Sequence, residues 1–488
     1  MKNKALRICA IVFAVYLALG ALFYWIAGDS LHFTSVSTDS VGANAALGEI
    51  TQGDEIKQSF LCEYDTLSSL TLTVGTMARV NTDVIVAELL DEAGARLQAL
   101  EIDTSTMKDF SDYTLQLSPV DNAKGKLFTL RLTSRGGTVG NAITLYYGNS
   151  VATGRVDVPG EIGDVEALYF NGERKLDDGG NPCTLCLRVS GVNYHWFGTY
   201  YWFIYAGGAL LLILGLLHVL HCRKKGKNHP ILAVVGSLTK YNFLIRQLVA
   251  RDFKTKYKRS VLGMLWSFLN PLLTMSIQYV VFSTLFKSSI DNFVIYLLSG
   301  IVCFNFFSEA TGMCLLSIIG NASLINKVYV PKYIYPFSRT LSSSINLLLS
   351  LVPLLLMLLI TRTPITPAIL LLPFVLLMLF LVSYGVGLIL ATMMVFFRDT
   401  QFLWGIFSML LMYLTPIFYP ESIIPDRFLT VYKLNPLYHI LRFIRSILID
   451  GVSLEPKAYL YCMLLCLIPF AVGILIFRKN QDKFVLNI

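Results

Sequence analysis

The residue types that could do chemistry are few and scattered in this 488-residue chain. His218, His221 and Cys222 stand close together, but a structural metal site needs four ligands and no fourth is near, so we expect no metal there. The ten acids outside residues 30–196 form no group of paired carboxylates that could act as general acid and base. We therefore predict that the chain is not an enzyme and binds no cofactor directly.

Three cysteines lie in the most polar part of the chain. Cys183 and Cys186 form a C-x-x-C pair, and Cys62 precedes them by more than a hundred residues. Such a pair is typical of a redox motif, half of a metal site or a structural element. We expect a single structural disulfide, for which Cys62 and one member of the pair are the candidates.

Composition and charge divide the chain into two parts. Hydrophobic residues make up 55% and charged residues only 15%, whereas soluble proteins average about 25% charged residues. Residues 30–196 hold 22 acids and 12 bases (net −10), and the remainder holds 10 acids and 28 bases (net +18). In a membrane protein an excess of Lys and Arg marks the cytoplasmic face, and no basic-aromatic pattern indicates nucleic-acid binding. The sequence predicts an acidic, water-soluble insert within a basic, multi-pass membrane protein.

Apolar stretches long enough to cross a bilayer, which takes about 20 residues, predict eight spans. Leu6–Ala27 and Tyr200–Leu220 flank the insert, and both have bases on the side away from it. By the distribution of Lys and Arg, residues 29–198 are extracellular and both termini are cytoplasmic at the plasma membrane. Six further spans are expected near Leu262–Phe286, Phe293–Ile319, Ile345–Ile360, Ala368–Phe396, Phe402–Phe418 and Ala458–Ile476.

The pattern yields five domains, which are an anchor (1–28), the external domain (29–198), a second anchor (199–222), a cytoplasmic segment (223–260) and a six-helix domain (261–488). Between the last two spans, Tyr419–Lys457 is rich in bases although it is expected outside. Its apolar run Leu437–Ile444 is too short to span, which is typical of a re-entrant or interfacial helix.

The external domain alternates between polar and apolar residues, which is the signature of β-strands. The expected strands are Ser69–Val74, Asp83–Leu90, Tyr113–Leu117, Leu127–Thr133 and Ala142–Tyr147, with hairpin loops at Asp91–Gly94 and Asp121–Gly125. Many short strands at this spacing predict an antiparallel β-sandwich or jelly roll. The pattern loosely resembles carbohydrate-binding jelly rolls, and a spacer or assembly domain that binds no glycan is an equal alternative.

The cytoplasmic segment predicts a basic amphipathic helix. Arg223–Arg259 contains eleven bases and one acid, Asp252. Tyr241, Leu244, Ile245, Leu248, Val249 and Phe253 recur at helical spacing, opposite Lys240, Arg246, Arg251 and Lys254. Such a helix lies on the inner membrane surface or packs on a soluble partner, and both can hold together.

From Leu238 to Ile488 the sequence resembles the type-2 ABC exporter permeases that move polysaccharides, O-antigens and teichoic acids. The resemblance rests on Tyr257-Lys-Arg-Ser-Val-Leu-Gly-Met-Leu-Trp-Ser-Phe-Leu-Asn-Pro-Leu272, Leu324-Ile-Asn-Lys-Val-Tyr-Val-Pro331, Phe397-Arg-Asp399, Thr415-Pro-Ile-Phe-Tyr-Pro420 and Asn435-Pro-Leu437. Six spans with both ends inside also match. Residues 1–237 depart from the plain six-span pattern, which puts the substrate's identity in doubt more than the mechanism.

The resemblance implies a separate ATPase partner. The chain has no G-x-x-x-x-G-K-[ST] loop to hold ATP phosphates, so the energy must come from another chain. The segment Gly320–Arg339 is by resemblance the coupling element, although a solvated connector is the alternative. The implied coupling residues are Asn326, Lys327, Val328, Tyr329, Pro331, Arg398 and Asp399, and the implied gate-helix residues are Arg251, Lys254, Lys258 and Arg259.

Aromatic side chains of the first and fifth core spans are implied to line the export path, because flat sugar faces stack on aromatic rings. For any one of them, packing against lipid or at the membrane interface is the alternative. The candidate path residues are Trp266, Phe268, Asn270, Tyr279, Phe282, Phe286, Glu309, Trp404, Tyr413, Phe418 and Tyr419. Glu309 is the only acid inside its span, so it is functional or paired with a base near the membrane edge. Pro271 after Asn270 is expected to kink the first span, as a gate hinge or only for packing.

These expectations combine into one predicted function. The chain is the permease subunit of an ATP-driven exporter that moves a lipid-linked polysaccharide or teichoic-acid-like polymer to the cell surface. Two copies would enclose the path, because six spans without an internal repeat cannot form a symmetric pore alone, and two ATPase chains would complete the assembly. The alternative is a membrane assembly protein or chain-length regulator of surface polysaccharide synthesis.

Overall fold

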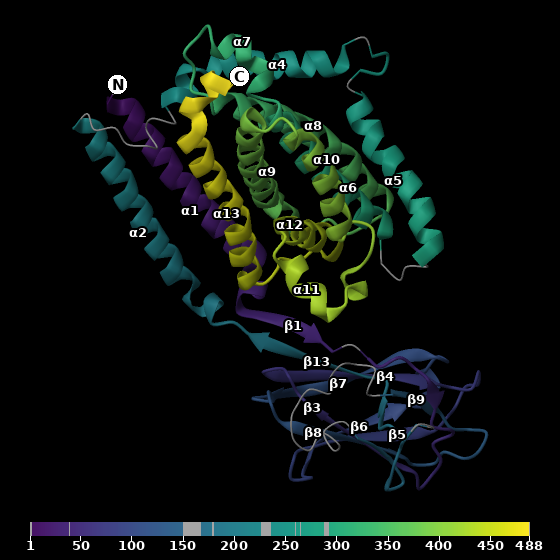
Figure 1. Cartoon of the computed structure of the whole chain (residues 1–488). Helices are drawn as coiled ribbons and strands as arrows, with labels where there is room; N and C mark the ends of the chain where they lie inside the picture. The colour runs from purple at the N-terminus through teal and green to yellow at the C-terminus, as the bar shows by residue number, and fades with distance from the viewer. Residues whose placement is uncertain are drawn as a thin grey trace. The chain divides into compact units, whose positions relative to one another are not determined.

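The structure is a computed structural model that describes residues 2–38, 40–149, 167–177, 180–225, 236–258, 260–263, 265–286 and 292–487. The chain divides into two compact units (Figure 1). One consists of His32–Thr199, and the other of Met1–Leu31 together with Tyr200–Ile488. The structure confirms a mostly helical chain with a separate antiparallel β-sheet region.

The β-unit is a sandwich of two antiparallel sheets. One sheet has the order β1-β13-β4-β9-β12, with β2 paired to β9 and β7 paired to β4, and the other has the order β11-β10-β3-β8-β5-β6. The strands are β1 (Phe33–Ser37), β2 (Ala45–Ala46), β3 (Glu55–Leu61), β4 (Thr66–Gly75), β5 (Val84–Leu90), β6 (Arg96–Asp103), β7 (Ser111–Asp121), β8 (Leu127–Ser134), β9 (Thr144–Asn149), β10 (Leu168–Phe170), β11 (Glu173–Arg174), β12 (Cys183–Leu185) and β13 (Leu187–Tyr194).

Each of the five predicted strands corresponds to an observed one, because alternation places every second side chain in the core. The loop Asp91–Gly94 joins β5 to β6 as a hairpin, with Gly94 at a φ of 77°. The second predicted hairpin is wrong, because β7 and β8 belong to different sheets. Residues 121–125 instead cross from one sheet to the other, and Ala123 N–H donates to Asp65 O at 2.9 Å on the way.

The predicted disulfide is absent. Cys62, Cys183 and Cys186 are all buried free thiols, and Cys62 and Cys183 lie in the apolar core between the sheets. Burial raises the pKa of the Cys186 thiol to about 11, so this thiol stays protonated at neutral pH. The three cysteines therefore act as small buried residues.

The outer face of the second sheet carries a cross-strand ion network. Glu88 on β5 accepts hydrogen bonds from Arg96 on β6 (3.0 Å) and from Arg131 on β8, and Arg131 also lies 3.7 Å from Glu55 on β3. The hydrogen bonds from Arg96 and Arg131 hold the pKa of Glu88 below its usual range. The network ties four neighbouring strands together on the side away from the core.

The helical unit begins with two anchor helices, α1 (Lys2–His32) and α2 (Trp196–Lys224). Their contact is made by tyrosines: Tyr16 Oη donates to Tyr205 O (3.0 Å), Tyr205 Oη to Leu17 O (2.8 Å), and Tyr201 Oη to Gly20 O (2.7 Å). Gly20 is required here, because a Cβ at this position would stand 2.0 Å from the Tyr205 ring. Through Phe23, α1 also contacts Tyr459 of the helix bundle at a ring-centroid distance of 5.2 Å.

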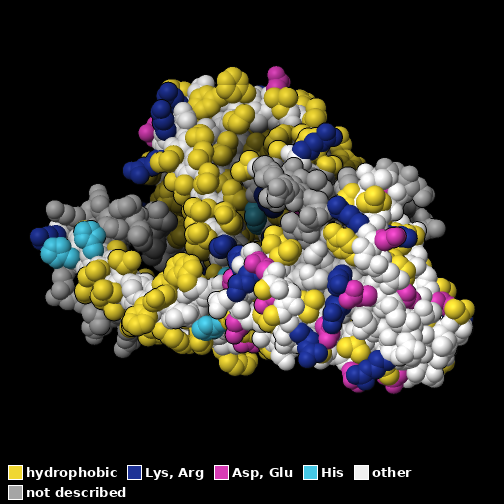
Figure 2. All heavy atoms as spheres, turned by 90° about the horizontal axis from the view of Figure 1, so that it is seen from below, with side chains coloured by type: hydrophobic (Ala, Val, Ile, Leu, Met, Phe, Trp, Pro, Cys, Tyr) yellow, Lys and Arg dark blue, Asp and Glu magenta, His cyan; other side chains and the backbone are white. Residues whose placement is uncertain are grey.

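The bundle itself consists of eleven α-helices among the described residues of the C-terminal half. They are α4 (Asn242–Tyr257), α5 (Leu265–Phe286), α6 (Phe293–Leu315), α7 (Ala322–Ile325), α8 (Ile334–Ile360), α9 (Leu372–Phe396), α10 (Thr400–Leu414), α11 (Asp426–Lys433), α12 (Pro436–Arg445) and α13 (Pro456–Asn480), followed by the four-residue α14 (Phe484–Asn487). In Figure 2 hydrophobic side chains cover large stretches of the helical unit, whereas charged side chains of both signs are interspersed over the β-sandwich.

Among the described residues, seven helices rather than the expected eight are long and apolar enough to cross a membrane. The exception is α10, whose 15 residues rise only about 22 Å against a bilayer core of about 30 Å. The helix ends because Thr415 precedes Pro416, which disfavours the α conformation, and Thr415 is extended. The span predicted at Ile345–Ile360 also begins earlier, at Ile334, because polar residues of its first turns are buried against neighbouring helices.

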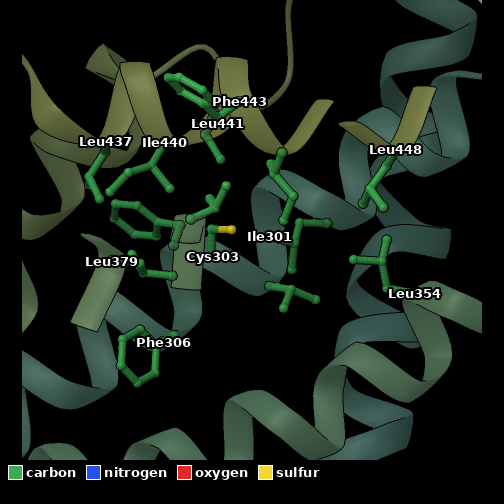
Figure 3. Packing of buried hydrophobic residues seen from close by; sticks show 14 of the residues in the cluster. Ile301, Cys303, Phe306, Leu354, Leu379, Leu437, Ile440, Leu441, Phe443 and Leu448 are labelled. Carbon is green, nitrogen blue, oxygen red and sulfur yellow. The ribbon is translucent and has the colours of Figure 1, made fainter. Parts of the chain in front are cut away.

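The core of the bundle surrounds α6. Most of this helix is buried, and α12 covers it through Leu437, Ile440, Leu441 and Phe443, as Figure 3 shows beside Ile301 and Cys303 of α6. The short apolar run predicted at Leu437–Ile444 is thus an amphipathic helix that packs on α6. On the other side, α9 and α13 approach closely at Gly385 and Gly473, where a Cβ on Gly473 would stand 2.2 Å from Gly385 O.

A first prediction concerns the ion network of the β-sandwich. Glu88→Gln should lower the stability of residues 32–199 by about 2 kcal/mol at pH 7, because a buried carboxylate loses two charge-assisted hydrogen bonds. The folded pKa lies below the ordinary carboxyl value of about 4.3, so the contribution of Glu88 is fully present above that pH and is lost as the pH falls through the folded pKa. Thermal unfolding should therefore show a wild-type advantage at pH 7 that shrinks below about pH 4.

The matched control is Glu101→Gln, which breaks the exposed ion pair with Arg135. An exposed pair contributes little, so this variant should unfold like the wild type at both pH values. Equal losses in the two variants would contradict a specific role for the Glu88 network.

Candidate functional site

The amphipathic helix α4 packs against the bundle rather than standing apart from it. Ile245 and Leu248 on its apolar face are buried in a cluster with residues of α8, α9 and α13. The apolar face that the sequence predicted for this helix is the face that packs against the bundle. The charged residues of α4 therefore lie at the rim of this contact, close to α6 and α8.

Asp252 organises the charges on the bundle side of α4. Its carboxylate is almost fully buried and lies 2.8 Å from Arg339 Nη1 of α8 and 3.3 Å from Arg251 Nη2. Arg251 Nη2 also donates to Asn321 Oδ1 at 3.1 Å. One buried carboxylate thus fixes the directions of two guanidinium groups.

Glu309 of α6 is paired with a base, which is one of the two roles that the sequence allowed for it. Its Oε1 accepts from Lys256 Nζ of α4 and from Asn346 Nδ2 of α8, both at 2.7 Å. A carboxylate within an apolar span is costly unless it is neutralised, so the pair with Lys256 supplies what the position needs. Glu309 thereby joins three helices, and none of the candidate aromatic residues of the path lines the cavity that it faces.

These groups line a cavity of about 490 Å³ among α4, α6 and α8, which we call the α4 cavity. Three bases (Arg251, Lys256 and Arg339) and two acids (Asp252 and Glu309) give it one excess positive charge. Sequence reasoning missed Lys256, Arg339, Ser342 and Asn346 as site residues. A signal existed, because Arg339, Ser342 and Asn346 recur at i, i+3 and i+7 and so form a polar stripe on one face of an apolar helix.

Of the predicted gate-helix residues that the structure describes, only Arg251 lines this cavity. Lys254 and Lys258 are exposed, and neither lines the cavity. Arg259 lies outside the described residues.

Part of the predicted aromatic path assembles at the other end of the bundle. Phe282 of α5 stacks on Phe418 with ring centroids 5.1 Å apart and planes 6° apart, and Tyr413 approaches Phe418 at 6.4 Å. Tyr419 Oη donates to Tyr413 O at 2.7 Å. These four residues form one aromatic group that joins α5, α10 and the segment after α10.

The other path candidates do not join this group. Tyr279 contacts Phe293 at 6.0 Å, and Trp404 contacts Phe307 at 6.2 Å and Phe407 at 5.7 Å. Trp266 is exposed near the start of α5, Phe268 is half-buried there, and Asn270 Oδ1 accepts only from Thr274 of its own helix (3.4 Å) among the described residues. Pro271 lies inside α5, as predicted, and the side chain of Phe286 is outside the described part.

The predicted coupling residues lie on two exposed loops. Asn326, Lys327, Val328 and Tyr329 follow α7, and Tyr329 is 92% exposed. The next residue, Val330, is buried in the same cluster as Ile245 and Val395, and Tyr241 Oη of the α4 region donates to Tyr329 O (3.3 Å). Arg398 and Asp399 are exposed between α9 and α10, and Pro331 is half-buried. The loop that carries the predicted coupling residues is shorter than Gly320–Arg339, because α8 already begins at Ile334.

Comparison with known proteins covers this half of the chain. Residues 244–449 match the family model for the ABC-2 type transporter. The O-antigen export system permease protein RfbA of Myxococcus xanthus is 30% identical over 264 residues, which are 53% of this chain and 100% of that protein. This chain belongs to the ABC-2 type transporter family. RfbA of Klebsiella pneumoniae is 29% identical over 252 residues (50% of this chain, 96% of that protein), and the polysialic acid transport protein KpsM of Escherichia coli is 26% identical over 252 residues (49% and 95%).

The family match sets the two halves of this ABC-2 permease apart. The α4 cavity and both exposed loops lie within residues 244–449, whereas the anchors and the β-sandwich lie outside them. Together with its apolar helices, family membership makes the chain a multi-pass membrane protein and a transport subunit. The β-sandwich thus lies outside the half of the chain that matches almost the full length of the relatives.

A second prediction tests the Lys256–Glu309 pair by exchanging its charges. Lys256→Glu and Glu309→Lys should each lower the thermal stability of the detergent-purified permease by about 1 kcal/mol, because each places like charges together. The double variant restores opposite charges and should recover most of the loss, as read from the shift in unfolding temperature.

Lys258→Glu is the control, because Lys258 is exposed and lines no part of the cavity. It should leave the unfolding temperature unchanged. Losses in the two single variants that simply add in the double variant would show that the two side chains do not interact.

Proposed function

We propose that this chain is the permease subunit of an ATP-driven exporter that moves a lipid-linked polysaccharide, or a teichoic-acid-like polymer, from the cytoplasm to the cell surface. The α4 cavity is the observation that carries this proposal. It offers two guanidinium groups and one ammonium group next to an amphipathic helix, at the edge of an apolar bundle. That combination suits a ligand with an anionic head and an apolar tail.

The chemistry of the cavity fits a phosphate or diphosphate head. Guanidinium groups bind phosphate oxygens in pairs, and a Lys ammonium adds a mobile point charge. Asp252 holds Arg251 and Arg339 in place before any ligand arrives, so little freedom is lost on binding. The excess of one positive charge favours an anion over a neutral lipid head.

The path for the polymer requires a second copy of the chain. α10 is exposed along most of its length, including Phe402, Ile406, Phe407 and Tyr413, and α5 exposes Trp266, Ile277 and Tyr279. In a homodimer these apolar, aromatic faces of α5 and α10 would enclose the path, and the flat faces of sugars would stack on the rings. Two copies related by a two-fold axis make such a path symmetric.

An ATPase subunit, also in two copies, supplies the energy. The exposed loops 326–329 and 397–399 lie at the end of the bundle where α4 packs. Exposed Tyr329 and Phe397, with Lys327 and Arg398 beside them, combine apolar and charged contacts for a soluble partner. In this arrangement both termini are cytoplasmic, and the β-sandwich is extracellular, where it either binds the emerging glycan or serves as a scaffold.

The coupling loop gives a third prediction. Tyr329→Ala should reduce co-purification of the ATPase with the permease at least about fivefold, because an exposed aromatic residue at the centre of an interface typically contributes more than 1 kcal/mol. The measurement is the ratio of the two subunits after affinity purification of the tagged permease, with ATP hydrolysis per permease as a second readout.

Val139→Ala is the control, because Val139 is equally exposed but belongs to the β-sandwich. It should leave the subunit ratio unchanged. If Tyr329→Ala also left both the ratio and ATP hydrolysis unchanged, the loop would not be a coupling element.

The transport function itself is tested by depleting the permease from cells and measuring lipid-linked polysaccharide on each side of the membrane. Accumulation inside together with loss outside is the expected result, and it would yield the substrate for chemical analysis. Normal export after depletion would overturn the proposal and favour a role in polymer assembly or chain-length control.

A further inference from the structure

A second polar cavity lies at the opposite end of α6. It has a volume of about 320 Å³ and is lined by Tyr296 of α6, by Pro416, Pro420 and Glu421 after α10, by Tyr438, Arg442 and Arg445 of α12, and by Ser446, Asp450 and Leu454. We call it the Arg445 cavity. Tyr296 and Glu309 are separated by about 20 Å along α6 at 1.5 Å per residue, so the two cavities are distinct sites.

Arg445 builds the wall of this cavity. It donates to Pro416 O (2.7 Å), Ile417 O (3.2 Å) and Tyr296 O (3.4 Å), and its guanidinium lies 3.4 Å from the centroid of the Tyr296 ring. Gly300 leaves the room for it, because a Cβ there would stand 3.2 Å from Arg445 Nη2. The segment after α10 is therefore fixed to α6 and α12, and Phe418 is held in its stack with Phe282.

Three further charged side chains line the cavity and have hydrogen-bond donors or acceptors without a partner among the described residues. Arg442 and Asp450 are exposed, and their side chains make no hydrogen bond or ion pair with any described residue. Glu421 accepts a hydrogen bond from Tyr438 Oη through one oxygen, while its other oxygen has no partner in the described part of the chain. This differs from the α4 cavity, where both acids are paired with bases.

The balance of charges decides which ligand fits. Two guanidinium groups and two carboxylates give a net charge of zero, so an anion would meet Glu421 and Asp450, and a cation would meet Arg442 and Arg445. A neutral molecule with several hydroxyl groups satisfies both signs, because each hydroxyl donates to a carboxylate and accepts from a guanidinium. The volume lies at the low end of the range for small-molecule sites, about 300–1,000 Å³, which leaves room for one small ligand.

We propose that the Arg445 cavity binds one uncharged sugar residue of the exported polymer, beside the Phe282–Phe418 stack. This rests on the proposed export function. In this proposal a sugar moves from the aromatic rings to Asp450 and Arg442. Hydrogen bonds with these two side chains replace those that water makes to its hydroxyl groups. Arg445 is a positioning residue in this site, because its Nη1 and Nη2 both donate to backbone carbonyls.

The test uses the full-length permease in lipid nanodiscs and a panel of neutral methyl glycosides (glucoside, galactoside, mannoside, rhamnoside and N-acetylglucosaminide). Saturation-transfer NMR should detect binding of at least one of them to the wild type. Asp450→Asn and Arg442→Gln should each weaken that binding about tenfold or more, because a charged hydrogen-bond partner is lost. Asp482→Asn, an exposed acid at the C-terminal end, is the control and should bind like the wild type.

Methyl glucuronide and inorganic phosphate complete the panel. Three results would overturn the proposal. They are preferential binding of glucuronide or phosphate over every neutral glycoside, no binding of any glycoside, and equal binding by Asp450→Asn and the wild type. Unfolding temperatures of the variants show whether a loss comes from misfolding, and Asp450→Glu should then retain part of the binding. The depletion assay measures export independently of sugar binding. If depletion stops export but the purified permease binds no glycoside, the sugar site is refuted and the export function stands.

Discussion

The carboxylate of Glu309 sets a constraint on the whole permease domain. It stands on the most buried helix of the bundle, where an ionised group is stable only with a partner of opposite charge and further hydrogen bonds. Lys256 and Asn346 meet both needs from two different helices. As a result α4 is attached to the bundle by an ion pair as well as by Ile245 and Leu248, and the basic cavity exists where the three helices meet.

The two polar cavities at the ends of α6 differ in their chemistry, and the proposed export of a lipid-linked glycan would use both. The α4 cavity has bases in excess and lies beside an amphipathic helix, whereas the charges of the Arg445 cavity cancel and the cavity is walled by backbone carbonyls bound to a guanidinium. One end suits an anionic head and the other suits hydroxyl groups. Between them α6 is mostly apolar and aromatic, with Asn305 as an exposed polar residue.

Patterns that depend on local periodicity were predictable from the sequence, and pairings between distant residues were not. Alternation located the strands and apolar length located most spans, because both follow directly from burial. The crossing between β7 and β8 was missed, since turn residues at 121–125 suit a hairpin and a sheet-to-sheet connection equally. The start of α8 was misplaced because its buried Ser338, Thr340 and Ser342 lower the local hydropathy although they are fully packed.

The same distinction holds for the candidate sites. The motif residues 326–329 and 397–399 were found by resemblance and lie on exposed loops. The Lys256–Glu309 pair spans 53 residues, and the contacts of Arg445 reach across 149 residues to Tyr296, so both depend on helix register in three dimensions. The prediction of a disulfide was wrong because C-x-x-C spacing carries no information on burial, and the fold buries all three cysteines as free thiols.

The tyrosine contacts of the anchors have a consequence for how the chain is made. Tyr16 and its partner Tyr205 are 189 residues apart, so at about 5–20 residues per second a ribosome needs roughly 10 to 40 seconds to synthesise the second after the first. Throughout that interval α1 is in the bilayer without the helix whose carbonyl its hydroxyl binds. In the making of this permease the two anchors therefore pair only after the whole β-sandwich has been synthesised.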